Sequence, residues 1–389
     1  MTISVQEHVV TISGSSCVIV ARLVAVLVAL LAAMSVPAAN WIPVGSMLGD
    51  RHTHQDALML DGRVLVYGGY TTIATPGIST SAEVYDPTTQ VWSDAASLSR
   101  VRHAPLTRLA DGKVLVGGGL NSASSTSEAY SPATNSWSDA GFLTSSHGGK
   151  PSATLLTSGL VLVAGGLDTA TSQYTAKATS FNPVTAVWQA AAAMNTGRNG
   201  HTSTLLLNGN VLVVGGANIS GVTFQSELYD PVLNIWSPTV SDSLGHRVHT
   251  ATRLLSGKVL VVGGLNDQNE VVSTTEMFDP ASNTWSDGPS MSVARKWHTA
   301  TLLHSGSVLV VGGVSSNNPE DELSSVELYD PATNSWAMAD SLPSPRAAHT
   351  ATLLYSGSVL VAGGITGGSS LKSSFLYQES DEIFASSFE

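Results

Sequence analysis

The chain has 389 residues, of which only 12% are charged, and a formal net charge of −12 at pH 7. This acidic balance, with Lys and Arg dispersed along the sequence, removes the electrostatic basis for binding nucleic acid or anionic membrane surfaces. The 36 glycines and the dense turn signals favour a β-rich repeat protein over a helical one.

Residues 1–39 are typical of an export signal with a long lead. Arg22 precedes an apolar run from Leu23 to Met34, and the small residues Ala38 and Ala39 suit cleavage. The run is too short for a bilayer, which takes about 20 residues. We expect cleavage after Ala38 or Ala39 and a secreted product, extracellular or periplasmic, with no transmembrane anchor. Cys17, the single cysteine, lies in the leader, so no disulfide is expected.

Two signals recur through the rest of the chain. Tryptophans stand 45 to 51 residues apart, at positions 41, 92, 137, 188, 236, 285 and 336. A Gly-Gly pair ends at positions 69, 119, 166, 216, 264, 313 and 364. Trp41 precedes every pair and no tryptophan follows Gly364, so the incomplete first and last copies together make one complete unit. A closed ring requires this arrangement.

Each unit contains four strand-length segments bounded by turn residues. Asp-Gly, Asn-Gly or Ser-Gly pairs separate the first two segments, as in tight antiparallel hairpins. The second segment, such as residues 259–262, is apolar at successive positions and must be covered on both faces. This period with four strands predicts an all-β, seven-bladed propeller over residues 40–378. An outer strand at Trp41 would join the last blade, residues 349–377, and close the ring.

The clearest units contain, in this order, His-Thr-Ala-Thr-Leu-Leu, Val-Leu-Val, Gly-Gly, Glu-Leu-Tyr-Asp-Pro and Trp. This unit resembles the repeat of exported bacterial kelch proteins. The resemblance covers nearly all of residues 41–378 and implies a kelch propeller of the galactose oxidase-like superfamily. Some kelch propellers are copper-radical oxidases that need a cysteine crosslinked to a tyrosine. Because the exported chain would lack cysteine, we expect no such cofactor. Other kelch propellers act on sugars, as sialic-acid mutarotases do, so a mutarotase- or epimerase-like enzyme stays open.

Loop lengths indicate which rim of the ring carries function. From the aromatic residue of Tyr-Asp-Pro to the next Trp the step is always 7, whereas from the second glycine to that aromatic it varies from 11 to 16. Variable loops on a repeated scaffold are where binding sites form. They share a rim with the segments that lead into each Arg-x-x-His. We therefore assign binding to this rim and to the mouth of the central channel.

Most residues of this rim repeat from blade to blade, which favours a structural role. They are the pairs Arg51/His54, Arg100/His103, Arg198/His201, Arg295/His298 and Arg346/His349. Residues that break the pattern are the binding candidates. Trp297 is the single tryptophan out of phase and could stack on a sugar or pack between blades. The other candidates are Lys296, His147, Lys150, Tyr174, His246, Arg247, Tyr70 and Phe224.

Catalytic and metal-binding motifs are weak. His52 and His54 could lie on one side of a strand, but no third ligand is identifiable, and we predict no metal site and no other cofactor. Residues 317–322 are acidic without the spacing of a calcium loop. The short tail 379–389 is either a sorting signal or a frayed terminus. We expect a monomer that binds a glycan or an extracellular protein, with the sugar-directed enzyme as the alternative.

Overall fold

The structure is a computed structural model that describes residues 40–72, 77–219, 221–240, 245–318 and 320–379. From Trp41 onward these residues belong to one compact unit. The expected leader with Cys17, its cleavage site and the tail beyond Glu379 lie outside the described residues. No helix among the described residues is both long enough and apolar enough to cross a bilayer.

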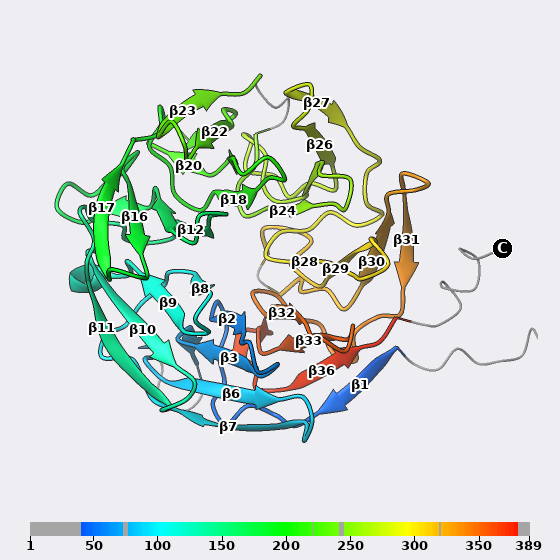
Figure 1. The fold of residues 1–389 in the computed structure, drawn as a ribbon. Helices are drawn as coiled ribbons and strands as arrows, with labels where there is room; N and C mark the ends of the chain where they lie inside the picture. The colour runs from blue at the N-terminus through cyan, green and yellow to red at the C-terminus, as the bar shows by residue number, and fades with distance from the viewer. Residues whose placement is uncertain (1–39, 73–76, 220, 241–244, 319, 380–389) are drawn as a thin grey trace, which may run out of the picture. The chain divides into compact units, whose positions relative to one another are not determined.

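Seven four-stranded antiparallel sheets are arranged around a central channel, as predicted (Figure 1). The strands of blades 1 to 3 are β2 (Gln55–Leu58), β3 (Val64–Tyr67), β6 (Ala82–Asp86) and β7 (Val91–Ala95); β8 (Leu106–Arg108), β9 (Val114–Gly117), β10 (Thr126–Ser131) and β11 (Ser136–Phe142); β12 (Ser152–Leu155), β13 (Val161–Ala164), β16 (Ala178–Asn182) and β17 (Val187–Ala191).

The strands of blades 4 to 7 follow the same pattern. They are β18 (Thr202–Leu205), β19 (Val211–Val214), β22 (Glu227–Asp230) and β23 (Ile235–Pro238); β24 (Thr250–Arg253), β25 (Val259–Val262), β26 (Thr275–Asp279) and β27 (Thr284–Asp287); β28 (Thr299–Leu302), β29 (Val308–Val311), β30 (Val326–Asp330) and β31 (Ser335–Ala339); β32 (Thr350–Leu353), β33 (Val359–Ala362), β36 (Ser374–Tyr377) and β1 (Trp41–Val44).

The first and last described strands share a sheet, which confirms the predicted closure. β1 pairs antiparallel with β36, with Trp41 opposite Tyr377 and Val44 opposite Ser374. The indole packs against Tyr377 with ring centroids 5.2 Å apart and the rings tilted by 56°, and Nε1 donates to the carbonyl of Asp340 at 2.7 Å. In Figure 1, blue β1 lies beside red β36. Blade 7 therefore has an outer strand from the start of the described chain.

The second strand of every blade is buried at all four positions, as its unbroken apolar sequence predicts. Seven apolar clusters fill the seven interfaces between adjacent blades. Trp41 is 6% exposed and belongs to the cluster between blades 6 and 7. The core is thus a closed ring of inter-blade contacts.

The constant step of 7 residues is explained by the outer hairpin of each blade. In blade 6, Tyr329 lies directly opposite Trp336 in the register, and the rings are 5.2 Å apart. Asn334 turns the chain with φ of 50°, and the Tyr329 hydroxyl donates to its Oδ1 at 2.7 Å. Insertion of a residue would separate this aromatic pair, so the turn keeps its length.

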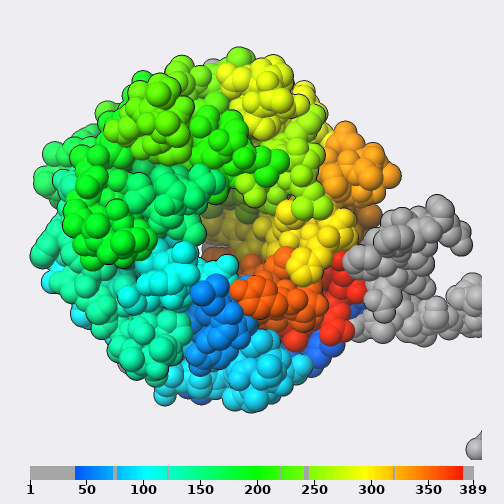
Figure 2. Space-filling model, in the orientation of Figure 1, coloured from blue at the N-terminus to red at the C-terminus, as the bar shows by residue number. Residues whose placement is uncertain are grey.

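The variable rim carries small hairpins in four blades. They are β4 (Tyr70–Thr71) with β5 (Gly77–Ile78), β14 (Leu167–Asp168) with β15 (Gln173–Tyr174), β20 (Ala217–Asn218) with β21 (Gly221–Val222), and β34 (Ile365–Thr366) with β35 (Ser369–Ser370). Blade 2 has instead the 3-10 turn η1 (Asn121–Ala123). These elements surround the opening that Figure 2 shows at the centre of the ring.

Candidate functional site

The repeated arginines are buried inside the blades. In blade 6, Arg295 donates to the carbonyl of Gly312 at 2.8 Å and to Glu327 Oε1 at 2.7 Å, and neither charged side chain is exposed. Arg51, Arg102 and Arg198 make the same contacts with a Gly-Gly carbonyl and a glutamate. An ion pair buried this deeply fixes the Gly-Gly turn and is unavailable to a ligand.

Blade 2 uses Arg102 for this buried position, whereas the sequence comparison had placed Arg100 there. Arg102 bonds to Glu128 at 2.8 Å, and Arg100 is exposed. The segment between the arginine and the inner strand is one residue shorter in blade 2, because His103 alone occupies the place of His52 and Thr53. The shift in spacing caused the incorrect assignment.

Two of the predicted binding residues also occupy the arginine position. His147 donates through Nδ1 to the carbonyl of Gly165 at 2.8 Å, and His246 contacts Gly263 O at 3.1 Å and Glu276 at 2.7 Å. Both histidines are 0% exposed. They replace the buried arginine of blades 3 and 5 and do not reach the channel, so we leave them out of the candidate site.

The repeated histidines connect neighbouring blades around the channel. His298 Nε2 hydrogen-bonds to Thr250 Oγ1 of the preceding blade at 3.0 Å. Equivalent contacts join His54 to Thr350, His201 to Ser152, His249 to Thr202 and His349 to Thr299. Burial, and the charge of the neighbouring arginine, lower the pKa of His298 to about 3. These imidazoles are therefore neutral scaffold groups at neutral pH.

Six blades turn one residue toward the channel mouth in the left-handed conformation. The residues are Thr53, Gly149, Gly200, Val248, Trp297 and Ala348, with φ between 52° and 67°. Five of the six are small or of medium size. Since the conformation recurs around the ring, it belongs to the scaffold, and blade 6 differs from the other blades by the large side chain that it carries at this position. Trp297 is 39% exposed and therefore projects from this ring, which places the indole at the channel mouth.

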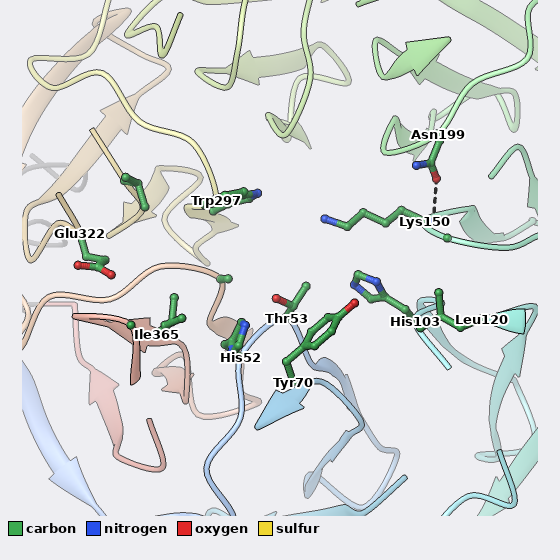
Figure 3. Close-up of a pocket in the computed structure, with 14 residues that line it drawn as sticks. His52, Thr53, Tyr70, His103, Leu120, Lys150, Asn199, Trp297, Glu322 and Ile365 are labelled. Carbon is green, nitrogen blue, oxygen red and sulfur yellow. Dashed lines mark hydrogen bonds between the residues drawn. The ribbon is translucent and has the colours of Figure 1, made fainter. Parts of the chain in front are cut away.

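Trp297 lines a cavity of about 570 Å³ at the mouth, together with Tyr70 and Lys150 of the predicted set. His52 stacks on Tyr70 with centroids 5.5 Å apart, and His103 meets the same ring edge-on at 6.2 Å. Figure 3 shows these rings on one side and Lys150 reaching toward Trp297. Leu120, Val314 and Ile365 add apolar wall, and Asn199 and Glu322 add polar groups.

A second cavity of about 360 Å³ adjoins the first and shares Lys150, Asn199 and Trp297 with it. It is lined in addition by the predicted residues Tyr174, Arg247 and Lys296. The ammonium of Lys296 lies 4.9 Å from the centroid of the Trp297 ring. Six of the nine predicted binding residues thus meet at one mouth.

Phe224 is 38% exposed but lines neither cavity; it lies against Gly245 of the next blade. Conversely, the sequence comparison did not select His103, Asn199 or Glu322 as ligand contacts. A signal for Asn199 was present, because it follows the buried arginine in the same position as Arg247 and Lys296. Glu322 comes from a loop whose length varies, where the repeat gives no guide.

His52, His103 and Tyr70 lie together at this mouth, but the described residues include no cysteine that could crosslink to a tyrosine. His52 Nδ1 is 2.8 Å from the hydroxyl of Ser370, and its ring lies against Tyr70. His54 faces Thr350 in the neighbouring blade. Across the described ranges, no three His, Cys, Asp or Glu side chains are grouped to hold a metal ion. The residues present therefore do not fit a copper-radical group.

Comparisons with known proteins agree with the architecture. The Kelch motif matches residues 55–99, 246–292 and 298–343, which lie in blades 1, 5 and 6. A fungal alcohol oxidase of the AA5 family, solved in complex with copper, is 18% identical, with a TM-score of 0.70 over 88% of this chain and 78% of that chain. At this identity the likeness shows the fold alone. No curated protein matches the sequence. The chain is thus similar to kelch repeats in three of its seven blades and shares its propeller fold with this oxidase.

Proposed function

We propose that this propeller is a binding module that recognises a glycan at the channel mouth. The carrying observation is the conformation of Trp297: its position in the ring is left-handed, and it presents an indole where five equivalent positions carry Thr, Gly, Val or Ala. A sugar ring has an apolar C–H face that stacks on an indole and hydroxyls that need hydrogen bonds. Both kinds of group line the cavity.

The size and chemistry of the cavity support this proposal. Small-molecule sites usually measure roughly 300–1,000 Å³ and combine apolar walls with a few polar groups. The mouth holds about 570 Å³, bounded by Trp297 and Tyr70 and by the polar side chains of Asn199 and Glu322. Burial and the nearby charge of Lys150 lower the pKa of His103 to about 4. This ring therefore stays neutral at neutral pH and can exchange hydrogen bonds with hydroxyls.

A glycan-array screen with matched variants tests the proposal. Trp297→Ala recreates in blade 6 the residue that blade 7 has at Ala348 in the same conformation, so folding should be retained. Losing the burial of the indole should weaken glycan binding by about 1.5–3 kcal/mol, roughly ten- to a hundredfold. Phe224→Ala removes an exposed aromatic outside the cavities and should leave binding unchanged.

Two results would contradict the proposal. If the wild-type protein binds no glycan, the mouth serves another partner, such as an extracellular protein. If Trp297→Ala binds glycans as tightly as the wild type, the indole is not the stacking platform. NMR of anomeric exchange in any bound sugar separates binding from turnover.

We also propose that the module acts after export, on the strength of the leader expected in residues 1–39. N-terminal sequencing of the protein recovered outside the producing cells should find a chain starting at Ala39 or Asn40. Recovery of the intact chain from the cytoplasm would contradict this proposal.

A further inference from the structure

The channel mouth gathers positive charge in a chain that is acidic overall. Lys150, Arg247 and Lys296 line one cavity of about 360 Å³, while the whole chain has a net charge of −12. The three residues come from blades 3, 5 and 6 and are far apart in sequence. Only the closed ring brings them together.

Backbone geometry fixes the position of each cation. Arg247 and Lys296 follow the buried Arg/His position of their blades, and each pairs in an antiparallel bridge with the residue after the Gly-Gly turn, Leu265 and Val314. Lys150 results from an insertion of one residue, because blade 3 has Gly149 and Lys150 where blade 1 has Thr53 alone. The side chains therefore start from defined points on the rim.

The two better-packed cations are oriented by neutral amides. Arg247 Nη2 donates to Asn269 Oδ1 at 2.9 Å, and Lys296 Nζ donates to Asn317 Oδ1 at 2.6 Å. Asn317 Nδ2 in turn donates to the carbonyl of Asn269 at 2.8 Å, which connects the loops of blades 5 and 6. These contacts position the cations without neutralising them.

No ion pair joins the three cations to a carboxylate within the described part of the chain, whereas Arg63, Lys113, Lys177 and Lys258 on the surface each pair with an aspartate. Lys113, for example, lies 3.2 Å from Asp111. The Nε of Arg247 is buried without a hydrogen-bond partner. Desolvation, and then the charge of Arg247, lower the pKa of both Lys150 and Lys296. Lys150 is nevertheless exposed in the mouth, and its charge remains uncompensated.

We propose that Lys150, Arg247 and Lys296 bind the anionic group, a carboxylate or a sulfate, of an acidic saccharide whose ring stacks on Trp297. This inference rests on the proposed function and specifies its ligand class. Trp297 borders both cavities, so one sugar can contact the indole and the cations together. The opposite side of the mouth, with Tyr70 and Ile365, offers the aromatic and apolar surface for the rest of the chain of sugars.

Calorimetry with three hexasaccharides tests the inference: oligogalacturonate, its neutral galactose counterpart and a sulfated galactose oligomer that has no carboxylate. The protein should bind at least one acidic probe about tenfold or more tighter than the neutral one, and added salt should reduce the difference. Lys150→Met and Arg247→Met should each weaken binding of that probe by about tenfold, as expected for a charge-assisted contact, and leave neutral binding unchanged. The uronate and sulfate arms distinguish the two anion sources.

Lys113→Met is the matched control, because it removes an exposed lysine from the opposite rim, in the turn between β8 and β9. It should change no affinity. Unfolding midpoints of all variants should equal that of the wild type, which separates lost binding from lost folding.

Failure of this inference is distinguishable from failure of the proposed function. Equal affinity for acidic and neutral probes, with Trp297→Ala still weakening the binding of both, overturns the anion site and leaves glycan binding standing. A different outcome is that the protein binds inorganic sulfate, that Lys150→Met abolishes this binding, and that no saccharide binds. This outcome supports the anion site and overturns the glycan proposal. Absence of binding to all saccharides and to sulfate overturns both.

Discussion

Truncating the closing tryptophan should destabilise the ring more than truncating its counterpart in a continuous blade. Trp41 and Trp92 are a matched pair: they are 6% and 4% exposed, and each packs against a tyrosine ring with centroids 5.2 Å apart. Replacing a buried tryptophan with alanine costs about 3–5 kcal/mol. The two substitutions therefore start from the same loss of packing.

The difference arises from the indole nitrogen and from the attachment of the strand. Trp41 Nε1 donates to the carbonyl of Asp340 at 2.7 Å, whereas Trp92 Nε1 is buried without a partner. Losing the hydrogen bond adds about 1 kcal/mol to the cost of Trp41→Ala, and removing an unpaired donor reduces the cost of Trp92→Ala by about 1 kcal/mol or more. Trp41→Ala should thus exceed Trp92→Ala by about 2 kcal/mol.

Urea unfolding followed by circular dichroism measures this difference, and hydrogen exchange shows where it acts. In Trp41→Ala the amides of β1 and β36 should lose protection first, because β1 is joined to β36 by strand pairing and not by a hairpin turn like the one between β6 and β7. Deleting residues 40–43 should have a larger effect, since it leaves β36 as an unpaired edge. A Trp92→Ala protein as unstable as Trp41→Ala, or unchanged exchange in β36, would refute this account of ring closure.

Two further predictions concern the buried charges and the histidine ring. Glu327→Gln leaves Arg295 buried without its carboxylate and should lower the free energy of unfolding, measured in urea, by about 3–5 kcal/mol. Asp61→Asn, which removes the carboxylate of an exposed ion pair, should lower it by less than about 1 kcal/mol. Equal losses in the two variants would argue against a structural role for the buried pair. Burial lowers the pKa of His201 and His298 to about 3, below their unfolded value of 6.5, so stability is complete above pH 6.5 and falls as the pH drops toward 3. At pH 5 each of these two histidines should lower the free energy of unfolding by about 2 kcal/mol. A urea unfolding midpoint that is the same at pH 7.5 and pH 5 would contradict this prediction.

The ring could be predicted from the sequence because its signals are local and repeated. The fixed spacing of Tyr329 and Trp336 and of their equivalents reports a cross-strand pair, and the unbroken apolar second strand reports burial on both faces. The displaced Trp41 predicted closure for the same reason. These features depend on neighbours within one repeat, which a single sequence contains.

The sequence misled where a blade changes length or carries a different residue at a repeated position. The motif Arg-x-x-His fits Arg100 with His103, but the shortened segment places Arg102 in the buried position. In blades 3 and 5 a histidine fills the arginine position, so His147 and His246 looked exceptional in sequence while serving the common scaffold. Burial decides between these roles, and burial depends on the assembled ring.

The sequence indicated Lys150, Arg247 and Lys296 as separate candidates on the variable rim, but it could not show that the three lie together in one cavity. Positions 150, 247 and 296 become neighbours only after seven blades close, and one of them depends on an inserted residue. Arg247 and Lys296 are held by the neutral amides of Asn269 and Asn317 and not by carboxylates. Both amides come from loops whose length varies from blade to blade, so the repeat does not predict them.

The left-handed residue at the mouth of six blades has a consequence for design. Thr53, Val248 and Ala348 show that this position tolerates different side chains above the same buried Arg/His and Gly-Gly support. Selection by phage display from a library varied at these six positions should yield folded proteins with altered ligand preferences. Side chains at the channel mouth can therefore be changed one blade at a time without altering the buried residues that hold each blade together.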